Sequence, residues 1–293
     1  MNIGQKIKSL RIAKMMTQNE LAGDNITRNM LSRIENGFAL PSIQTLMYIS
    51  EKLGVPAGYL LSEESEDFGY KKLIGMPEVM RAFHAGEWQI CMDLCLALGG
   101  IDDEISYILS LCTYNSAKEL FASGELKLAA KMFDAAKQQC MNTSYSLSNV
   151  VAECDTYICG ISYISPLIVS DIDVVPAPSP GSFGEDFCRY FTVLRVLEEK
   201  GNAEISIRRL LVGGWAKNQY TDHINARVKI KYGNHSEAYH ILKGLLASDY
   251  NIPAPMLYFI FSDLEVCCRE LSDYRGAYEY SGDKTGMLEK FLG

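Results

Sequence analysis

The sequence predicts an all-α protein in two parts, a bundle of five short helices over residues 1–61 and an array of helical hairpins over residues 75–293. Three observations favour this fold class. Apolar residues recur throughout at the three- and four-residue spacing of a buried helix face. Side chains that begin and end helices follow one another closely in the first part. In the second part, pairs of helical segments joined at a turn residue recur along the chain, as in repeat arrays.

The charge of the chain is divided unequally between these parts. Residues 1–60 contain seven Lys or Arg and four Asp or Glu, a net charge of +3, whereas the whole chain carries −8. The remainder therefore carries −11, so we expect only the N-terminal part to attract a polyanion. The nine cysteines are scattered, no signal-peptide core is present, and no apolar run approaches the ~20 residues of a membrane span. These features predict a cytoplasmic protein that does not enter a membrane.

Two helices are predicted at the start of the chain. An apolar stripe indicates a first helix from about Ile3 to Lys14. Thr17 and Glu20 have the spacing of a capping box, which begins a short second helix. Asn25 lies where the chain must then turn, and asparagine tolerates a left-handed backbone better than most residues.

The third predicted helix, in the stretch NITRNMLSRIENG, has an apolar and a polar face. Thr27 caps this helix and Gly37 ends it. The positions expected to face inward are Met30 or Leu31, Ile34 and Phe38. The positions expected to face outward are Arg28, Asn29, Ser32 and Arg33.

Two further helices complete the predicted bundle. Ser42 caps the fourth, Gly54 ends it, and Pro56 begins the fifth. Within the bundle, the second and third helices are short and joined by a tight turn, and the third exposes Arg and Asn in its first turn. This is the arrangement of a helix-turn-helix motif.

The segments TQNELA, NITRNMLSRIENG, PSIQTLMYISEKLGV and PAGYLL resemble the phage-repressor type of helix-turn-helix, the Xre/Cro family. The resemblance covers residues 1–61 and implies a five-helix, lambda-repressor-like domain that binds double-stranded DNA. Two features depart from the family pattern. Asn25 stands where glycine is usual, and the loop FALPS lacks the usual basic residue, which removes one expected phosphate contact.

The resemblance also implies roles for individual residues. The third helix would lie in the major groove, with Arg28, Asn29, Met30 and Arg33 near the base edges. Gln18 would contact a phosphate or support the base-reading side chains. Further phosphate contacts would come from Thr17, Thr27, Lys6 and Asn36. Arg11 and Glu35 would instead form a salt bridge between the first and third helices.

A different organisation follows the bundle. The acidic and polar composition of residues 62–74 predicts a linker. Paired helical segments come next, with turns expected at Gly86, Gly124, Gly201, Gly233 and Ser272. One unit resembles a tetratricopeptide repeat, which implies a right-handed array of hairpins, at the positions Ala117, Leu120, Gly124, Ala129, Phe133 and Ala136. A proline-rich stretch at about 165–184 cannot be helical throughout, and we expect a long loop that is either a lid or disordered.

The second part shows no motif of a known catalytic centre. It contains no HExxH, no nucleotide-binding glycine loop and no GxSxG, so the sequence predicts neither an enzyme nor a cofactor. Cys91 and Cys95 are one helical turn apart and could hold a metal or sense oxidation. Both fall at interior repeat positions, which favours packing, and no metal site is predicted.

An array of hairpins has a concave face lined by the first helix of each pair. Projecting the repeat spacing places basic, aromatic and amide side chains on that face, namely Tyr114, Lys118, Phe191, Arg195, His223, Arg227, Asn115 and Asn225. Cations suit the carboxylate of an extended peptide, amides suit its backbone and aromatic rings suit its apolar side chains. A second interpretation is that these positions are merely exposed.

A repressor-type domain followed by a helical repeat array resembles the peptide-sensing regulators of the Rgg/PlcR/PrgX-like group. The resemblance implies a homodimer, a roughly palindromic operator and a signalling peptide as ligand. Two other interpretations remain open at this point. The array could bind a protein partner, or it could serve only as a dimerisation scaffold.

Overall fold

Every regular element is a helix in the part of the chain that the structure, a computed structural model, describes, namely residues 2–62, 67–169, 186–198 and 217–293. The chain divides into two compact units, Met1–Ile101 and Asp102–Gly293. Within the described ranges, no helix combines the length and the apolar character needed to cross a bilayer. The predicted all-α fold class is confirmed, whereas the hand of the array stays a prediction.

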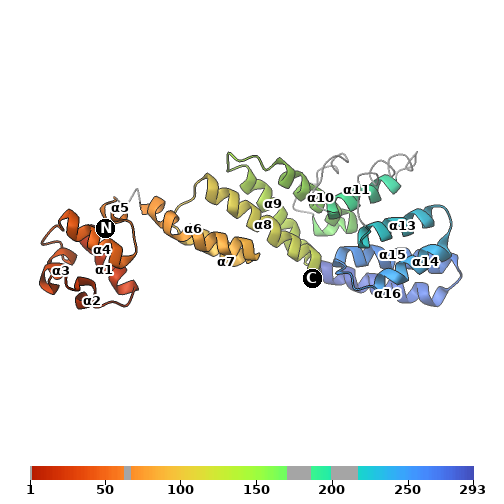
Figure 1. The fold of residues 1–293 in the computed structure, drawn as a ribbon. Coiled ribbons are helices and arrows are strands. Elements are labelled where there is room, and N and C mark those ends of the chain that lie inside the picture. Colours follow the sequence, from red (N-terminus) through yellow and green to blue (C-terminus); the bar gives the residue numbers. More distant parts are fainter. Residues whose placement is uncertain (1, 63–66, 170–185, 199–216) are drawn as a thin grey trace. The chain divides into compact units, whose positions relative to one another are not determined.

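Five short helices open the first unit (Figure 1): α1 Ile3–Ala13, α2 Gln18–Ala22, α3 Arg28–Glu35, α4 Ile43–Leu53 and α5 Ala57–Leu61. The predicted caps Thr17, Thr27 and Ser42 are confirmed, because each side-chain oxygen accepts a hydrogen bond from the backbone N–H three residues later. Asn2 caps α1 in the same way. Gly54 ends α4 in a left-handed conformation, as predicted.

The turn between α2 and α3 differs from the prediction. Gly23 has the positive φ, +48°, whereas Asn25 does not. A Cβ atom at position 23 would lie 2.4 Å from the hydroxyl of Tyr48, which donates a hydrogen bond to the carbonyl of Ala22. The glycine is therefore required both by the backbone and by the approach of the tyrosine from α4.

The core of the bundle consists of apolar side chains from all five helices. Its fully buried members include Ile7, Leu21, Leu31, Ile34 and Ile49. The prediction that Phe38 faces inward is wrong, because its side chain is 76% exposed. The helical spacing does not extend to this residue, since α3 ends at Glu35 and Gly37 turns the chain with φ +75°.

Two longer helices, α6 Asp67–Ala85 and α7 Trp88–Ala97, complete the first unit. Residues 67–74 of the predicted linker, 62–74, are thus helical, and residues 63–66 lie outside the described residues. The linker role of this stretch stays a prediction. The polar composition gives no sign of one aromatic contact in this stretch. Tyr70 packs edge-on against Tyr59, with 5.9 Å between the ring centroids. Gly86 takes φ +75° between the two helices, as predicted for a turn.

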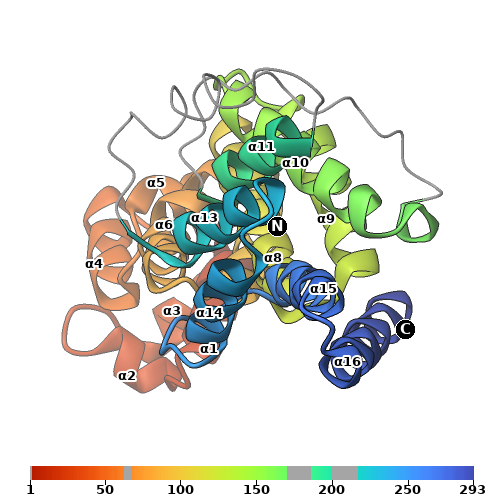
Figure 2. The same cartoon turned by 90° about the vertical axis from the view of Figure 1, so that its right-hand side faces the viewer.

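The second unit is an array of helices whose neighbours along the chain pack together (Figures 1 and 2): α8 Asp103–Ser123, α9 Leu126–Cys140, α10 Ser148–Ile164, the 3-10 helix η2 Pro166–Ile168, α11 Asp186–Glu198, α13 Gln219–Lys231, α14 His235–Leu246, α15 Ala254–Glu270 and α16 Tyr274–Leu292. Three hairpin turns are confirmed by a positive φ at Gly124, Gly233 and Ser272. Gly201 and residues 170–184 of the predicted loop lie outside the described residues.

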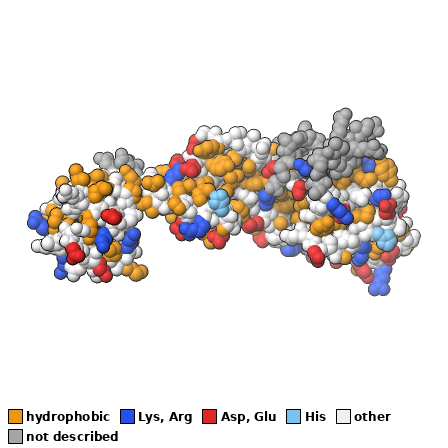
Figure 3. All heavy atoms as spheres, in the orientation of Figure 1, with side chains coloured by type: hydrophobic (Ala, Val, Ile, Leu, Met, Phe, Trp, Pro, Cys, Tyr) orange, Lys and Arg blue, Asp and Glu red, His pale blue; other side chains and the backbone are white. Residues whose placement is uncertain are grey.

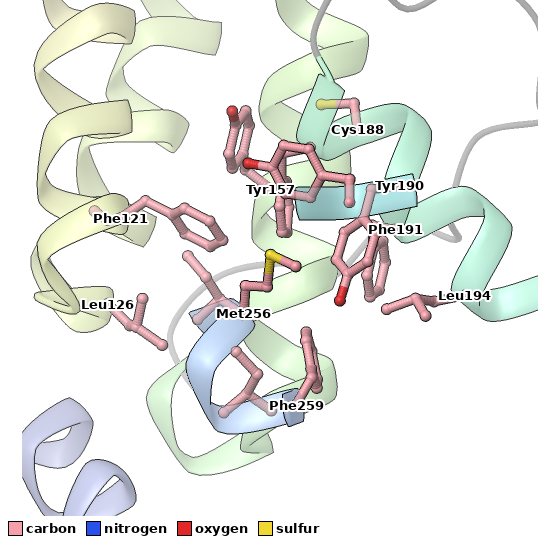
Figure 4. Packing of buried hydrophobic residues seen from close by; sticks show 14 of the residues in the cluster. Phe121, Leu126, Tyr157, Cys188, Tyr190, Phe191, Leu194, Met256 and Phe259 are labelled. Atoms are coloured by element: carbon pink, nitrogen blue, oxygen red, sulfur yellow. The ribbon is translucent and has the colours of Figure 1, made fainter. Parts of the chain in front are cut away.

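Aromatic side chains dominate the core of the second unit (Figure 4). The ring of Tyr157 stacks on Phe133 at 4.5 Å and on Phe187 at 4.9 Å, measured between centroids. Small residues at the repeat positions Ala117, Ala129 and Ala136 are fully buried, which brings the paired helices close enough for these rings to fill the remaining space.

Candidate nucleic-acid interface and array face

Burial of one face of α3 determines which of its side chains reach solvent. Leu31 and Ile34 are fully buried in the bundle core. Arg28, Asn29 and Arg33 are exposed on the other face. Met30 is 37% exposed, so it belongs to the outward face rather than to the core. The amino-terminal turn of α3 therefore presents a guanidinium, an amide and a thioether side by side.

A buried carboxylate fixes the orientation of this helix. Glu35 accepts hydrogen bonds from Arg11 through both oxygens, at 2.6 and 3.0 Å, and a third from Gln18 Nε2 at 2.8 Å. Burial alone would raise the pKa of Glu35, but the donors from Arg11 and Gln18 outweigh it and lower that pKa. The three side chains tie together α1, α2 and α3, so the salt bridge implied by the family resemblance is present.

The remaining predicted DNA contacts fall into different structural situations. Thr17 and Thr27 are exposed, and their hydroxyls cap α2 and α3. Asn36 is exposed and donates a hydrogen bond to the carbonyl of Ser32. Gln18 is half-buried and donates a hydrogen bond to Glu35, and its two expected roles at DNA stay predictions.

Lys6 has to be withdrawn from the predicted phosphate contacts. Its side chain is 2% exposed, and its ammonium donates to the carbonyls of Tyr59 and Ser62 and to the Ser62 hydroxyl. These bonds hold α1 against the end of α5. An isolated lysine in an amphipathic helix gives no sign in the sequence of whether its long side chain turns inward.

Sequence reasoning also missed a residue that supports the interface. Gly4 in α1 lies against α3 so closely that a Cβ atom there would be 2.1 Å from the carbonyl oxygen of Ile34. The glycine thus sets the distance between the first helix and the recognition helix. A glycine inside an otherwise amphipathic helix was the available signal.

The predicted lining of the array is largely turned inward. Tyr114 is 5% exposed and donates a hydrogen bond to Glu153, and Phe191 and His223 are fully buried. The prediction of these three as residues of an open groove is wrong. The repeat spacing identifies a helix face, but in this unit the neighbouring helices cover that face along much of its length.

Other predicted residues of the array do reach the surface. Lys118 is half-buried above the ring of Tyr114, at 5.2 Å from its centroid, and Asn115 donates to the carbonyl of Leu111. Asn225 is exposed and, with Ile241 and Tyr250, lines a cavity of about 580 Å³ beside α13 and α14.

A polar network connects three helices of the second unit, α11, α13 and α15. His223 on α13 lies with Nδ1 2.7 Å from the hydroxyl of Tyr190 and with Nε2 2.9 Å from Asp263 Oδ2. Burial lowers the pKa of His223 and outweighs the effect of Asp263, so the imidazole is neutral. Arg227 pairs with Asp263 on α15 and with Glu198 on α11. Burial opposes the charged form of Arg227, but the attraction of Asp263 outweighs it and leaves the pKa of Arg227 raised.

The cysteines of the described residues are packing residues. Cys91 and Cys95 are fully buried, and burial raises the pKa of Cys95 to about 12. Such a thiol holds its proton at neutral pH and is a poor nucleophile and metal ligand. In the described part of the chain, no group of three or more His, Cys, Asp or Glu side chains is placed to hold a metal ion.

A short helix with exposed Arg and Asn, braced against two others and joined to one of them by a tight turn, defines the helix-turn-helix class of DNA-binding domain. Residues 4–66 match a protein-family model described as a helix-turn-helix domain. The N-terminal part of this chain is therefore a helix-turn-helix domain. No curated protein sequence matches the chain.

Three solved structures align with nearly the whole chain. PlcR of Bacillus thuringiensis, in complex with the peptide PapR7 and DNA, is 13% identical, with 99% of this chain and 96% of that chain covered and a TM-score of 0.23. The apo form of ComR from Streptococcus vestibularis is 17% identical, with 97% and 91% covered and a TM-score of 0.21. ComR from S. thermophilus, in complex with DNA and its signalling peptide ComS, is 16% identical, with 98% and 99% covered and a TM-score of 0.23. TM-scores of this size do not define a common overall fold.

Proposed function

We propose that this protein is a sequence-specific transcriptional regulator that acts in the cytoplasm and carries out no catalysis. The observation that carries the proposal is the face of α3, where Arg28, Asn29 and Arg33 are exposed while Glu35 holds the helix in place. Arginine pairs with guanine and asparagine with adenine through two hydrogen bonds each, and Met30 suits a thymine methyl group. The proposed DNA-binding domain spans residues 1–61.

The array, proposed to span residues 75–293, has two roles in this proposal. It holds two copies of the chain together, so that two recognition helices meet a roughly palindromic operator. It also takes a signalling peptide, whose binding changes the spacing of the two DNA-binding domains. The surface residues Lys118, Arg195 and Asn225 support a peptide ligand, because they offer cations to its carboxylates and an amide to its backbone.

Selection of bound DNA from a random pool tests this function. The full chain is incubated with the pool in the presence and in the absence of medium conditioned by cells that carry the protein. Enrichment of one sequence with inverted half-sites, and a change in that enrichment with the medium, is the expected result. A pool that stays random overturns the DNA-binding proposal.

The same experiment separates the roles of the array. Enrichment that does not respond to the medium removes the peptide from the proposal. Capture of one defined protein by the array in that case favours a partner-binding role, and capture of none favours a dimerisation scaffold. A peptide ligand requires unequal affinity for the two conformations of the array, since a ligand that binds both equally shifts neither.

A further inference from the structure

One carboxylate of the array, that of Glu198, lies close to two guanidinium groups and one phenolic hydroxyl. Glu198 is the last residue of α11, and its Oε1 lies 3.3 Å from the guanidinium of Arg227 on α13. The hydroxyl of Tyr163 on α10 donates to the same oxygen. The guanidinium of Arg195 lies 3.6 Å from Oε2 and 5.2 Å from the centroid of the Tyr163 ring. Three helices thus direct their donors at one carboxylate.

This cluster lies at the surface but is anchored in the core. The side chains of Glu198 and Arg195 are 32% and 44% exposed, so solvent and solutes reach them. Arg227 is 19% exposed and is fixed from behind by Asp263, which is 7% exposed. The donor that faces outward is therefore held in position by a buried partner, as in a preorganised anion site.

The charges of the cluster are balanced only while Glu198 is in place. Arg195 and Arg227 carry two positive charges, Asp263 and Glu198 carry two negative charges, and His223 behind them is neutral. Removal of Glu198 alone leaves one uncompensated positive charge with two guanidinium groups and a phenol around it. That combination is the one that recognises a carboxylate.

We propose that Arg195, Arg227 and Tyr163 form a carboxylate-binding site for the peptide ligand and that Glu198 occupies this site as an internal substitute. The inference rests on the proposed peptide-sensing function and names the group that is recognised. An incoming carboxylate exchanges places with that of Glu198, whose side chain is 32% exposed and can therefore turn towards solvent. The exchange breaks the ion pair between Glu198 on α11 and Arg227 on α13, so binding of the peptide changes one of the contacts between these neighbouring helices.

The carboxylate can come from the carboxyl terminus of a peptide or from an Asp or Glu side chain. Four pools of short synthetic peptides distinguish these sources: free or amidated at the carboxyl terminus, and each with or without Asp and Glu. The full chain is incubated with each pool, and retained peptides are identified by mass spectrometry. We expect that the amidated pool without acidic residues is not retained. Retention of the free pool without acidic residues identifies the carboxyl terminus as the source, and retention of the amidated pool with Asp and Glu identifies the side chains.

Variants then test the role of Glu198. Glu198→Gln removes the internal competitor, and we expect it to tighten binding of the retained peptides about tenfold, equivalent to about 1.4 kcal/mol. Arg195→Gln is expected to weaken binding. The matched controls are Glu279→Gln and Arg275→Gln, which remove the partners of an exposed ion pair on α16. Circular dichroism and thermal unfolding establish that each variant is folded.

Three outcomes decide the proposal. Equal retention of the acid-deprived, amidated pool overturns the carboxylate site, although peptide binding by the array stands. If Glu198→Gln and Glu279→Gln bind the retained peptides with equal affinity, the cluster only joins helices. That result also overturns the carboxylate site. If neither the parent nor Glu198→Gln retains any pool, the proposed peptide-sensing function is wrong, and the carboxylate site is wrong with it.

Discussion

The side chains of α3 form two groups, those that pack into the bundle and those proposed to read DNA. Leu31 and Ile34 bury one face, and Glu35 accepts three hydrogen bonds from the neighbouring helices. Arg28 takes no part in this packing, since it is exposed in the first turn. Its substitution therefore tests DNA reading without changing the fold.

We expect Arg28→Ala to weaken binding to the selected operator by about 1–3 kcal/mol, because a bidentate contact to one base is lost. The measurement is fluorescence anisotropy with a labelled duplex at a fixed salt concentration. The loss should be concentrated at one base position when substituted duplexes are compared. Arg275→Ala, at a 90% exposed position on α16, is the control for lost charge. Equal affinity of Arg28→Ala and the parent contradicts the assignment of Arg28 as a base reader.

A second prediction at the residue scale concerns His223. Its pKa is lowered in the folded protein by burial, so the unfolded chain binds a proton that the folded chain does not. Stability therefore falls as pH drops below the ordinary histidine pKa of about 6.5. We expect the melting temperature to decrease between about pH 7 and 5, and His223→Gln to reduce that dependence. His240→Gln, on the exposed surface, should keep the dependence of the parent. A parent-like pH profile in His223→Gln contradicts the prediction.

Contacts between residues close in the sequence could be predicted, whereas contacts between distant residues could not. Caps such as Thr17 and Thr27 are local, because donor and acceptor are three residues apart, and they were predictable. Burial of Lys6 depends on carbonyl groups more than fifty residues away, at Tyr59 and Ser62. Similarly, His223 meets Tyr190 and Asp263 only in the folded array. No spacing rule contains these long-range partners.

At the scale of elements, the sequence pattern predicts the helices and the turns between them. A left-handed residue between paired helices is a local requirement, and Gly124, Gly233 and Ser272 meet it. The start of α6 was missed, because composition indicated a linker while the contact between Tyr70 and Tyr59 stabilises a helix. The sequence pattern of one helix does not show which of its sides is covered by neighbouring helices, because that depends on the whole array. For this reason Phe191, predicted to line a groove, is fully buried.

The turn at Ser272 gives a test at this scale. Its φ of +61° strains a residue with a side chain, whereas glycine adopts this conformation readily. We expect Ser272→Gly to raise the free energy of unfolding by up to about 1 kcal/mol, as measured by urea denaturation. The reciprocal change Gly233→Ser, at φ +79° with no atom within 4 Å of an added Cβ, should lower it by a similar amount. Destabilisation by Ser272→Gly would show that its hydroxyl stabilises the turn.

The whole molecule combines a small basic domain with a large acidic remainder. Residues 1–60 carry +3 within a chain of −8, so one copy has few cations with which to neutralise phosphates. Because non-specific affinity rises with the number of phosphates neutralised, a single domain of this kind binds DNA weakly. In the proposed dimer, two domains joined through the array gain affinity, because the second domain binds as an intramolecular partner.

The spacing of the two half-sites in the operator should therefore control the affinity of the intact protein. Two recognition helices of a dimer meet half-sites about one helical turn, or about 10 base pairs, apart. Insertion of about half a turn between the selected half-sites moves one of them to the opposite side of the duplex. We expect affinity to fall by about a hundredfold or more, because only one domain can then bind. Insertion of a whole turn should restore part of this affinity, and the comparison is made by anisotropy at one salt concentration. If the half-turn insertion leaves affinity unchanged, each copy binds alone, and the array does not couple two DNA-binding domains.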